Sequence, residues 1–253
     1  RLGYTGSLNL IDPNIFNATE GIGEWVDAMV RVEGTAVRDL NQVFLFDWAL
    51  QPDIEGERIS LEKIAPVPAV GSACVTVVPS GPTTVDDANQ RLILEAISCA
   101  RERIYLTTPY FIPDESVMRT LCIAGDGGVD VRLMLPGKPD HWYADCVAES
   151  YFGELIKHGV KVYRYTPGFL HGKSIMVDRE AAFVGSANMD YRSFELDYEC
   201  GVMVYSAPMI ESLLEDMDMI VDHSRLVTKE EWAKRSVLRR VFEPLLRLFA
   251  IWM

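Results

Sequence analysis

Apolar and polar residues alternate in short segments that are rich in β-branched side chains, and this pattern predicts strands. The predicted strands are Val75 to Val78, Ile104 to Thr107, Val129 to Leu135, Lys161 to Tyr165, Ser174 to Val177, Ala182 to Val184 and Gly201 to Tyr205. Between them, apolar residues recur at helical spacing. Helices are predicted from Asp86 or Asp87 to Arg103, from Pro113 or Asp114 to Ile123, from about Trp142 to Lys157 and from Ala207 to Val221. This alternation predicts an α/β fold whose sheet is covered by helices on both faces.

Two parts of the chain resemble each other. Tyr4 to Asn9 (YTGSLN) matches Phe183 to Asn188 (FVGSAN), and Asp27 to Val32 matches Glu199 to Val204, where an acidic residue opens an apolar strand. We therefore expect two half-domains of one plan. Residues 1–65 would be the end of the first half and residues 66–253 a complete second half, with Pro66 to Pro68 as the connector.

Composition narrows the classes of function. The 253 residues are 49% hydrophobic and 24% charged, as in a globular protein. A net charge of −13 argues against binding nucleic acid through general phosphate neutralisation. The five cysteines include no C-x-x-C pair and are interpreted as reduced core residues. The sequence lacks an apolar run of the roughly 18 residues that a membrane-spanning helix needs.

The segment around His171 carries the residue types that phosphate chemistry needs. His171 and Lys173 project from one face of an extended chain, so an imidazole lies beside an ammonium. Ser186 and Asn188 are again two residues apart and add a hydroxyl and an amide, while Gly185 permits close approach of the backbone. Such a set fits a phosphodiester.

Phosphodiester transfer without a metal requires a nucleophile, donors to the non-bridging oxygens and a proton source for the leaving alcohol. The imidazole of His171 suits either the first or the last role, because its ordinary pKa is about 6.5. Glu199 is the candidate carboxylate on the other ring nitrogen, and Lys173 the charge on the phosphate. Asp178 is counted with His171, Lys173 and Glu199 among the catalytic candidates, although its place at a strand end favours a structural role. No metal-ligand spacing is present, so neither a metal nor another cofactor is expected.

Together, His171, Lys173, Asp178, Gly185, Ser186 and Asn188 resemble the HKD signature of the phospholipase D superfamily. Thr107 to Asp114, Pro167 to His171 and Gly21 to Gly34 resemble, more narrowly, the bacterial cardiolipin synthases. The resemblance implies a mixed sheet, a pseudo-two-fold repeat and a covalent phosphatidyl-histidine without a metal. It also implies that Glu199 holds the catalytic histidine and that Asp27 takes the corresponding place in the first half.

The first-half motif departs from the family pattern. Its offset would place the histidine, lysine and aspartate before Arg1, and only Ser7 and Asn9 remain as phosphate-binding candidates. In the superfamily the first-half histidine is usually the nucleophile, so the resemblance implies an acid and base role for His171. We expect a chain truncated before its first motif and inactive alone, unless a homodimer or an upstream segment completes the site.

Some residues carry weaker signals. Tyr110 and Phe111 follow a predicted strand and are candidates for lining a pocket, with core packing as the alternative. His141, His158 and His223 lack partners at motif spacing and are interpreted as surface or cap residues. From Lys229 to Met253 the sequence predicts a basic, aromatic, amphipathic tail that packs on the core, binds anionic lipid, or does both.

Three functions stay open on these grounds. The first is transfer between two phosphatidylglycerol molecules to give cardiolipin and glycerol, the second is hydrolysis by a phospholipase or nuclease of the same superfamily, and the third is lipid-phosphate binding without catalysis. The expected partners are phosphatidylglycerol and anionic membrane lipid. The expected location is the bacterial inner membrane, facing the cytoplasm or bound peripherally.

Overall fold

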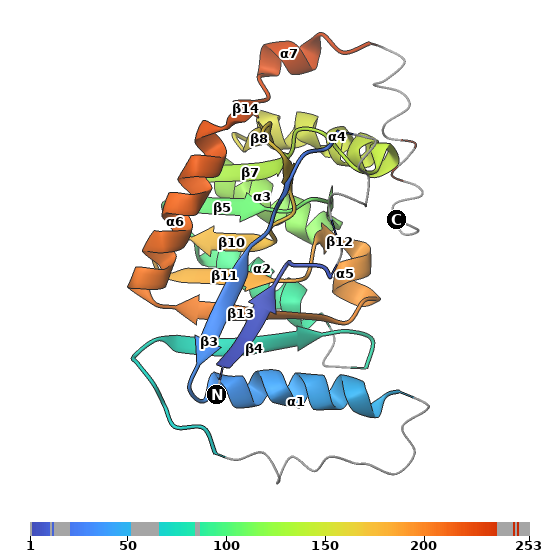
Figure 1. The fold of residues 1–253 in the computed structure, drawn as a ribbon. Helices are drawn as coiled ribbons and strands as arrows, with labels where there is room; N and C mark the ends of the chain where they lie inside the picture. The colour runs from blue at the N-terminus through green and yellow to red at the C-terminus, as the bar shows by residue number, and fades with distance from the viewer. Residues whose placement is uncertain are drawn as a thin grey trace.

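The computed structural model describes residues 2–10, 12, 21–51, 66–83, 87–236, 245 and 247. Its centre is an eight-stranded mixed sheet in the order β14-β8-β7-β5-β10-β11-β13-β4 (Figure 1). In chain order these strands are β4 (Cys74–Ser80), β5 (Arg103–Thr107), β7 (Asp130–Pro136), β8 (Lys161–Tyr165), β10 (Ser174–Val177), β11 (Ala181–Gly185), β13 (Glu199–Tyr205) and β14 (Ser224–Leu226). Strands β5, β7 and β8 are parallel neighbours, and the other pairings are antiparallel.

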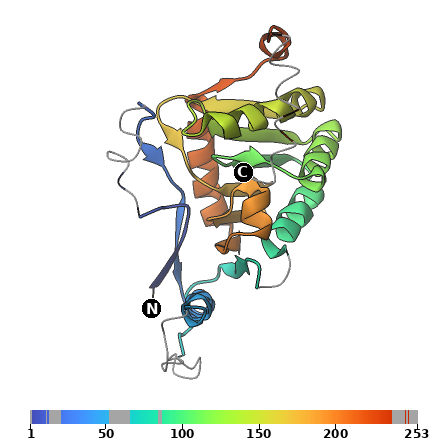
Figure 2. The ribbon, with the colours of Figure 1, turned by 90° about the vertical axis from the view of Figure 1, so that its right-hand side faces the viewer.

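Helices cover both faces of this sheet, as Figures 1 and 2 show. Helices α2 (Ala88–Cys99), α3 (Glu115–Asp126) and α4 (Trp142–Lys157) lie on one face, and α6 (Ala207–Asp222) lies on the other. The remaining helices are α1 (Ala36–Ala49), α5 (Tyr191–Glu195) and α7 (Lys229–Ala233). The predicted α/β class is confirmed, and β8, β10 and α4 begin and end at the predicted residues.

Three two-stranded sheets surround the central one. They are β1 (Leu2–Gly6) with β3 (Met29–Glu33), β2 (Trp25–Val26) with β9 (Phe169–Leu170), and β6 (Phe111–Ile112) with β12 (Met189–Asp190). The first is antiparallel and the other two are parallel. The β2–β9 pair joins parts of the chain that lie far apart in sequence, and it fixes one wall of the site described below.

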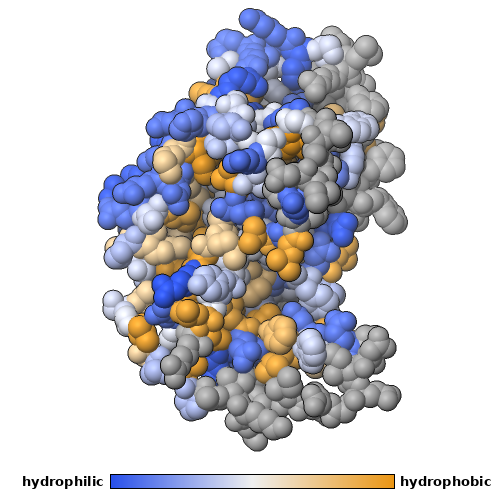
Figure 3. Space-filling model, in the orientation of Figure 1, coloured by the Kyte–Doolittle hydropathy of each residue, from blue (hydrophilic) through white to orange (hydrophobic). Residues whose placement is uncertain are grey.

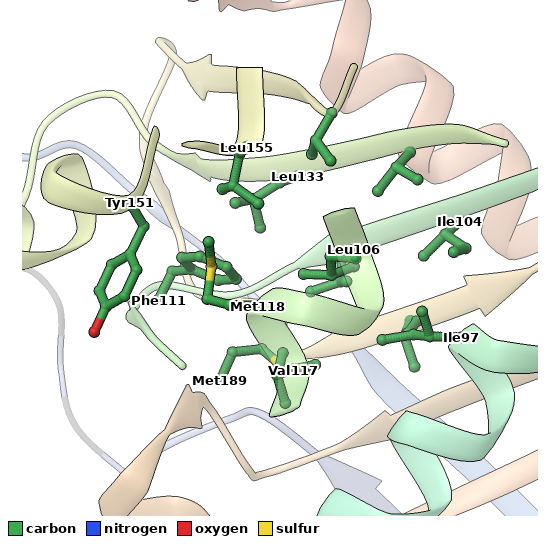
Figure 4. Close-up of a cluster of buried hydrophobic side chains, with 14 of the residues drawn as sticks. Ile97, Ile104, Leu106, Phe111, Val117, Met118, Leu133, Tyr151, Leu155 and Met189 are labelled. Atoms are coloured by element: carbon green, nitrogen blue, oxygen red, sulfur yellow. The ribbon is translucent and has the colours of Figure 1, made fainter. Parts of the chain in front are cut away.

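The larger core lies between the sheet and helices α2, α3 and α4. Its most buried side chains include Leu106, Phe111, Val117, Leu133 and Leu155, which Figure 4 shows packed together. Complete burial of a large apolar side chain contributes roughly 1.5–3 kcal/mol, so this layer is the main source of stability. A second core packs α6 against the opposite face of the sheet.

The repeat seen in the sequence has a counterpart in strand pairing. Strand β1 pairs antiparallel with β3, with Gly6 opposite Met29, and β11 pairs antiparallel with β13, with Gly185 opposite Gly201. A long helix follows the second strand in each case, α1 after β3 and α6 after β13. The division of the chain at residues 65 and 66 stays a prediction, because residues 52–65 lie outside the described residues.

The structure confirms the predictions for the C-terminal tail and the cysteines only in part. Thr228 caps α7 by accepting a hydrogen bond from the N–H of Glu231, but most of the predicted tail beyond residue 236 lies outside the described residues. All five cysteines are free, as predicted, yet Cys74 and Cys99 are exposed rather than buried in the core. No helix in the described ranges has both the length and the apolar character needed to cross a membrane.

Candidate functional site

A cavity of about 300 Å³ brings most of the predicted site residues together. Those that line it are Ser7, Asn9, Tyr110, His171, Lys173, Ser186, Asn188 and Glu199. They come from the segments after β1 and β11, the start of β13, the connection between β5 and β6 and the connection between β9 and β10. Ser7 and Ser186, which are 179 positions apart in the chain, therefore share one small space.

The imidazole of His171 is oriented by Asp27. Its Nδ1 lies 2.6 Å from Asp27 Oδ1; the side chain of His171 is buried and that of Asp27 is partly buried. The backbone explains the contact, because the N–H groups of His171 and Gly172 both donate to the carbonyl of Val26. This continues the parallel β2–β9 pairing and places residue 27 beside residue 171.

The structure corrects the predicted partner of His171. Sequence reasoning assigned that role to Glu199, but Glu199 accepts a hydrogen bond from Ser186 Oγ, and His171 is bonded to Asp27 instead. The carboxylate that orients the histidine of one predicted half thus comes from the other half.

Lys173 lies beside the second ring nitrogen of His171. Its Nζ is 2.8 Å from His171 Nε2 and 2.9 Å from the carbonyl oxygen of the same residue. An ammonium can only donate, so Nε2 is the acceptor, and the ring proton belongs on Nδ1, facing Asp27. This hydrogen-bond pattern is that of a neutral imidazole.

Burial sets the protonation of both basic groups. It lowers the pKa of His171, an effect that the hydrogen bond to Asp27 opposes and the charge of Lys173 reinforces. Burial also lowers the pKa of Lys173 to about 8, although the carboxylates of Asp27 and Glu199 act in the opposite direction. Near neutral pH the site therefore pairs a neutral histidine with a lysine that gives up its proton unusually easily.

The repeat extends to the hydrogen bonds. Ser7 Oγ donates to Asp27 and accepts from the N–H of Ala28, just as Ser186 Oγ donates to Glu199 and accepts from the N–H of Cys200. Both serines were predicted to contact phosphate directly. The structure instead engages their hydroxyls with carboxylates at the edge of the cavity.

Asp178 lies away from this cavity. Its carboxylate accepts hydrogen bonds from the backbone N–H groups of Arg101, Glu102 and Arg103, at the turn that leads into β5. Burial alone would raise the pKa of Asp178, but these hydrogen bonds lower it below its ordinary value. Although Asp178 belongs to the sequence motif, its contacts are those of a residue that joins β10 to β5.

The two aromatic residues considered for the pocket, Tyr110 and Phe111, lie in different surroundings. Tyr110 lines the cavity and donates to Asp140 Oδ2 at 2.6 Å, and burial together with this bond raises the pKa of its hydroxyl. Phe111 has no exposed surface and packs edge-on against Tyr151 in the larger core. The pocket role considered for Phe111 is therefore wrong, because its side chain points to the opposite side of β6.

Sequence reasoning missed other residues of the cavity wall. Asp140 and His141 line it, and the ring of Trp25 lies 4.5 Å from the ring of His171. His141 occupies the N-cap position of α4, although its side chain makes no capping hydrogen bond, and it also lines the cavity. A usable signal was its place after β7, because the carboxyl ends of neighbouring parallel strands gather ligand-binding residues. His158 and His223 are helix C-caps, as predicted.

The amide of Asn188 also lines the cavity, and its Oδ1 is buried without a hydrogen-bond partner in the described part of the chain. Within the same ranges, no group of three or more His, Cys, Asp or Glu side chains is placed to hold a metal ion. The arrangement as a whole offers an oriented imidazole, a buried ammonium, an amide and two hydrogen-bonded carboxylates around a space of phosphodiester size.

Comparisons with known proteins define the class. A family model described as "Cardiolipin synthase, PLD-like domain" matches residues 93–221, half of the chain. The chain therefore belongs to this phospholipase D-like family.

Its relatives include cardiolipin synthase A of Cronobacter sakazakii, 34% identical over 98% of this chain, and cardiolipin synthase A of Klebsiella pneumoniae, 33% identical over the same share. The chain spans 51% of the length of each of these relatives.

Solved structures agree on the fold. The phosphatidylserine synthase of Haemophilus influenzae is 15% identical with a TM-score of 0.65, and the alignment covers 98% of this chain and 65% of that one. The phospholipase D family member Nuc of Salmonella typhimurium is 22% identical with a TM-score of 0.54, covering 62% of this chain and all of the other. At these identities the likeness establishes the phospholipase D fold alone.

Proposed function

We propose that the chain forms part of a phosphatidyltransferase site of the cardiolipin synthase type. One phosphatidylglycerol would transfer its phosphatidyl group to a hydroxyl of another, giving cardiolipin and glycerol. The observation that carries the proposal is the hydrogen-bonded array of Asp27, His171 and Lys173, in which an oriented neutral imidazole meets an ammonium in one cavity. The family relationship supports phosphatidylglycerol as the substrate.

Lys173 would bind the phosphate. Its Nζ donates to His171 Nε2 in the structure, and a non-bridging phosphate oxygen is a stronger acceptor for the same ammonium. The negative charge of the phosphate favours the protonated forms of both residues, so it raises the pKa that burial lowers. Substrate binding thereby prepares His171 to act as an acid, and the amide of Asn188 adds a further donor.

His171 would then serve first as acid and afterwards as base. A nucleophilic imidazole attacks phosphorus, the bond from phosphorus to the glycerol oxygen breaks, and His171 Nε2 gives its proton to that oxygen. In the second half-reaction the now neutral His171 takes a proton from a hydroxyl of the second phosphatidylglycerol. That oxygen attacks phosphorus and displaces the nucleophilic imidazole. Asp27 keeps the ring oriented throughout and stabilises its charged form.

Glu199 would orient the nucleophile. It takes the place in the second strand pair that Asp27 takes in the first, and Asp27 orients the histidine of the other predicted half. The nucleophilic imidazole would then come from a further segment of a longer form of the protein or from a second copy of this chain. Residues 1–65 and 66–253 are, in this proposal, the end of one half and the whole of the next, and the enzyme acts at the bacterial inner membrane.

The proposal is tested by incubating the chain with phosphatidylglycerol in mixed micelles, with and without free imidazole as an external nucleophile, and measuring products by mass spectrometry. Cardiolipin and glycerol should form with imidazole, and His171→Ala should lower their rate by about 10²–10⁴-fold, the usual contribution of a general acid or base. His158→Ala is the matched control, because that residue caps α4 away from the cavity.

Other products would contradict the proposal in distinct ways. Phosphatidic acid in place of cardiolipin would indicate a hydrolase of the same superfamily. Binding of glycerophosphoglycerol without product, even with imidazole and with a second chain in excess, would indicate a lipid-phosphate-binding module.

A further inference from the structure

A large apolar groove adjoins the phosphate cavity. It lies between α1, the edge strand β4 and α2, and its volume is about 1250 Å³. Apolar side chains on three walls include those of Val43, Phe46, Val77, Ala88 and Leu92. On the face turned to the viewer in Figure 3, hydrophobic residues gather above and along α1, the helix that forms one wall of the groove. The volume exceeds the roughly 300–1,000 Å³ of most small-molecule pockets, so the groove suits a long apolar ligand.

The groove meets the cavity at two residues. Ser186 and Glu199 line both spaces, and the hydrogen bond between them holds this boundary in place. A ligand whose phosphate lies beside Lys173 can therefore extend past Ser186 into the groove. The side chains of Asp39 and Asp47 on α1 also line the groove.

We propose that this groove binds an acyl chain of the phospholipid whose phosphate occupies the cavity. The proposal rests on the proposed function, since it takes the cavity as the phosphate site. Transfer of a hydrocarbon chain from water into an apolar groove is favourable in proportion to the area that it buries. The protein would then distinguish a phospholipid from a soluble phosphodiester by a surface outside the reacting atoms.

A second groove offers an internal comparison. It lies between α6 and β3, has a volume of about 740 Å³, and is lined by apolar side chains such as Met209, Leu213 and Met217. Among the described residues it shares no lining residue with the cavity. The pair of His171 and Asp27 lies between the two spaces, so a lipid bound at the phosphate site should leave this second groove unused.

The test uses isothermal titration calorimetry on the full chain. The ligands are glycerophosphoglycerol and monomeric phosphatidylglycerols whose acyl chains lengthen from butanoyl to octanoyl. Affinity should rise by up to about fourfold for each methylene that becomes buried. Gln42→Trp, which fills the α1 wall of the groove, should remove about tenfold or more of the octanoyl affinity and leave glycerophosphoglycerol binding unchanged.

Two substitutions are matched controls. Asn41→Trp changes the neighbouring amide on α1, which does not line the groove, and Ser212→Trp fills the α6 groove. Both should leave the dependence on chain length as it is in the unmodified chain. Ala88→Trp blocks the opposite wall and serves as the second variant if circular dichroism shows that Gln42→Trp is unfolded.

The outcomes separate this proposal from the proposed function. Intact binding of glycerophosphoglycerol without any dependence on chain length, or a dependence that Gln42→Trp and Ala88→Trp leave unchanged, would overturn the acyl groove alone. In a different outcome, affinity depends on chain length and these variants abolish that dependence, but Lys173→Met does not weaken the binding of glycerophosphoglycerol. That result would support the groove and contradict the phosphate site.

Discussion

Asp27 and Glu199 occupy equivalent places in two copies of one strand pair, yet their pKa values are shifted in opposite directions. Each carboxylate accepts a hydrogen bond from a serine that follows the first strand of its pair. Asp27 also bonds to His171, and that bond, together with Ser7 and the nearby charges, outweighs burial and lowers its pKa. Burial raises the pKa of Glu199 despite its bond to Ser186.

The difference shows that the strand pair supplies a place for a carboxylate, whereas the side chains that face the carboxylate set the direction of its pKa shift. A buried carboxylate stays charged only when donors and positive groups replace lost hydration. Asp27 has an imidazole partner. Among the described residues, Glu199 has hydroxyl donors, the like charge of Asp197 and the opposing positive charge of Lys173, and burial outweighs the groups that lower its pKa. Glu199 is therefore the place where a second imidazole would have the largest effect.

The largest expected effect concerns Asp178, which belongs to the sequence motif but, unlike Asp27 and Glu199, lies away from the cavity and bonds to backbone N–H groups. Asp178→Ala removes the acceptor of three backbone N–H groups and should lower the free energy of unfolding by about 3 kcal/mol. Because the folded pKa is lowered, the contribution is present above the unfolded value near pH 3.8 and is lost as the pH falls further. Urea denaturation measures the loss. An Asp178→Ala protein of unchanged stability but without phosphate binding would return Asp178 to the catalytic set.

The two strand pairs also differ in packing at the position opposite the glycine that ends the first strand. Gly201 faces Gly185 and the ring of Phe183, so a Cβ at position 201 has no room, whereas its counterpart Met29 is 45% exposed. Gly201→Ala should cost about 2 kcal/mol through overpacking. Met29→Ala should change stability by less than about 1 kcal/mol. Equal losses in the two variants, measured by thermal unfolding, would show that the two pairs are packed alike.

Substitution of Lys173, the positive charge near both Asp27 and Glu199, should change the free energy of unfolding by a smaller amount and in the stabilising direction. Its folded pKa of about 8 lies below the unfolded value of 10.5, so the folded protein binds fewer protons and its stability rises as the pH goes from about 8 to about 10. Lys173→Met should remove that rise. It should also stabilise the protein by about 1 kcal/mol near neutral pH, less than the pKa shift alone implies, because Asp27 and Glu199 lose a favourable charge.

Urea denaturation at about pH 7 and about pH 10 gives both values for Lys173→Met. Lys173→Arg is the control that keeps a charge at this position. A Lys173→Met protein with lower stability and an unchanged pH dependence would mean that the lysine stabilises the fold.

Much of the fold was predictable because it follows from local pattern. Strands such as Ser174–Val177 and the helix Trp142–Lys157 have a single hydrophobic period over their whole length, and the structure confirms their bounds. The two-residue strands were not predicted, since a segment such as Trp25–Val26 is too short to show a period. Those short pairings nevertheless hold the walls of the site.

The site was predictable as a set of residues but not as a set of contacts. Glu199 lies nearer to His171 in sequence than Asp27, which is 144 positions away, and sequence spacing favoured the nearer acid. The parallel pairing of β2 with β9 decides otherwise, because it is a long-range contact without a local signature. His141 was missed for a related reason, since its role depends on where the end of β7 lies relative to β10.

The central claim is that Asp27 rather than Glu199 orients His171. It is tested most directly by following the imidazole signals of the unmodified chain, Asp27→Asn and Glu199→Gln by NMR as the pH changes, with His171→Ala to identify the His171 signal. Asp27→Asn should lower the pKa of His171 by about one unit or more, because it removes the carboxylate charge and its hydrogen bond. Glu199→Gln should leave it nearly unchanged. A large decrease in Glu199→Gln with none in Asp27→Asn would contradict this assignment.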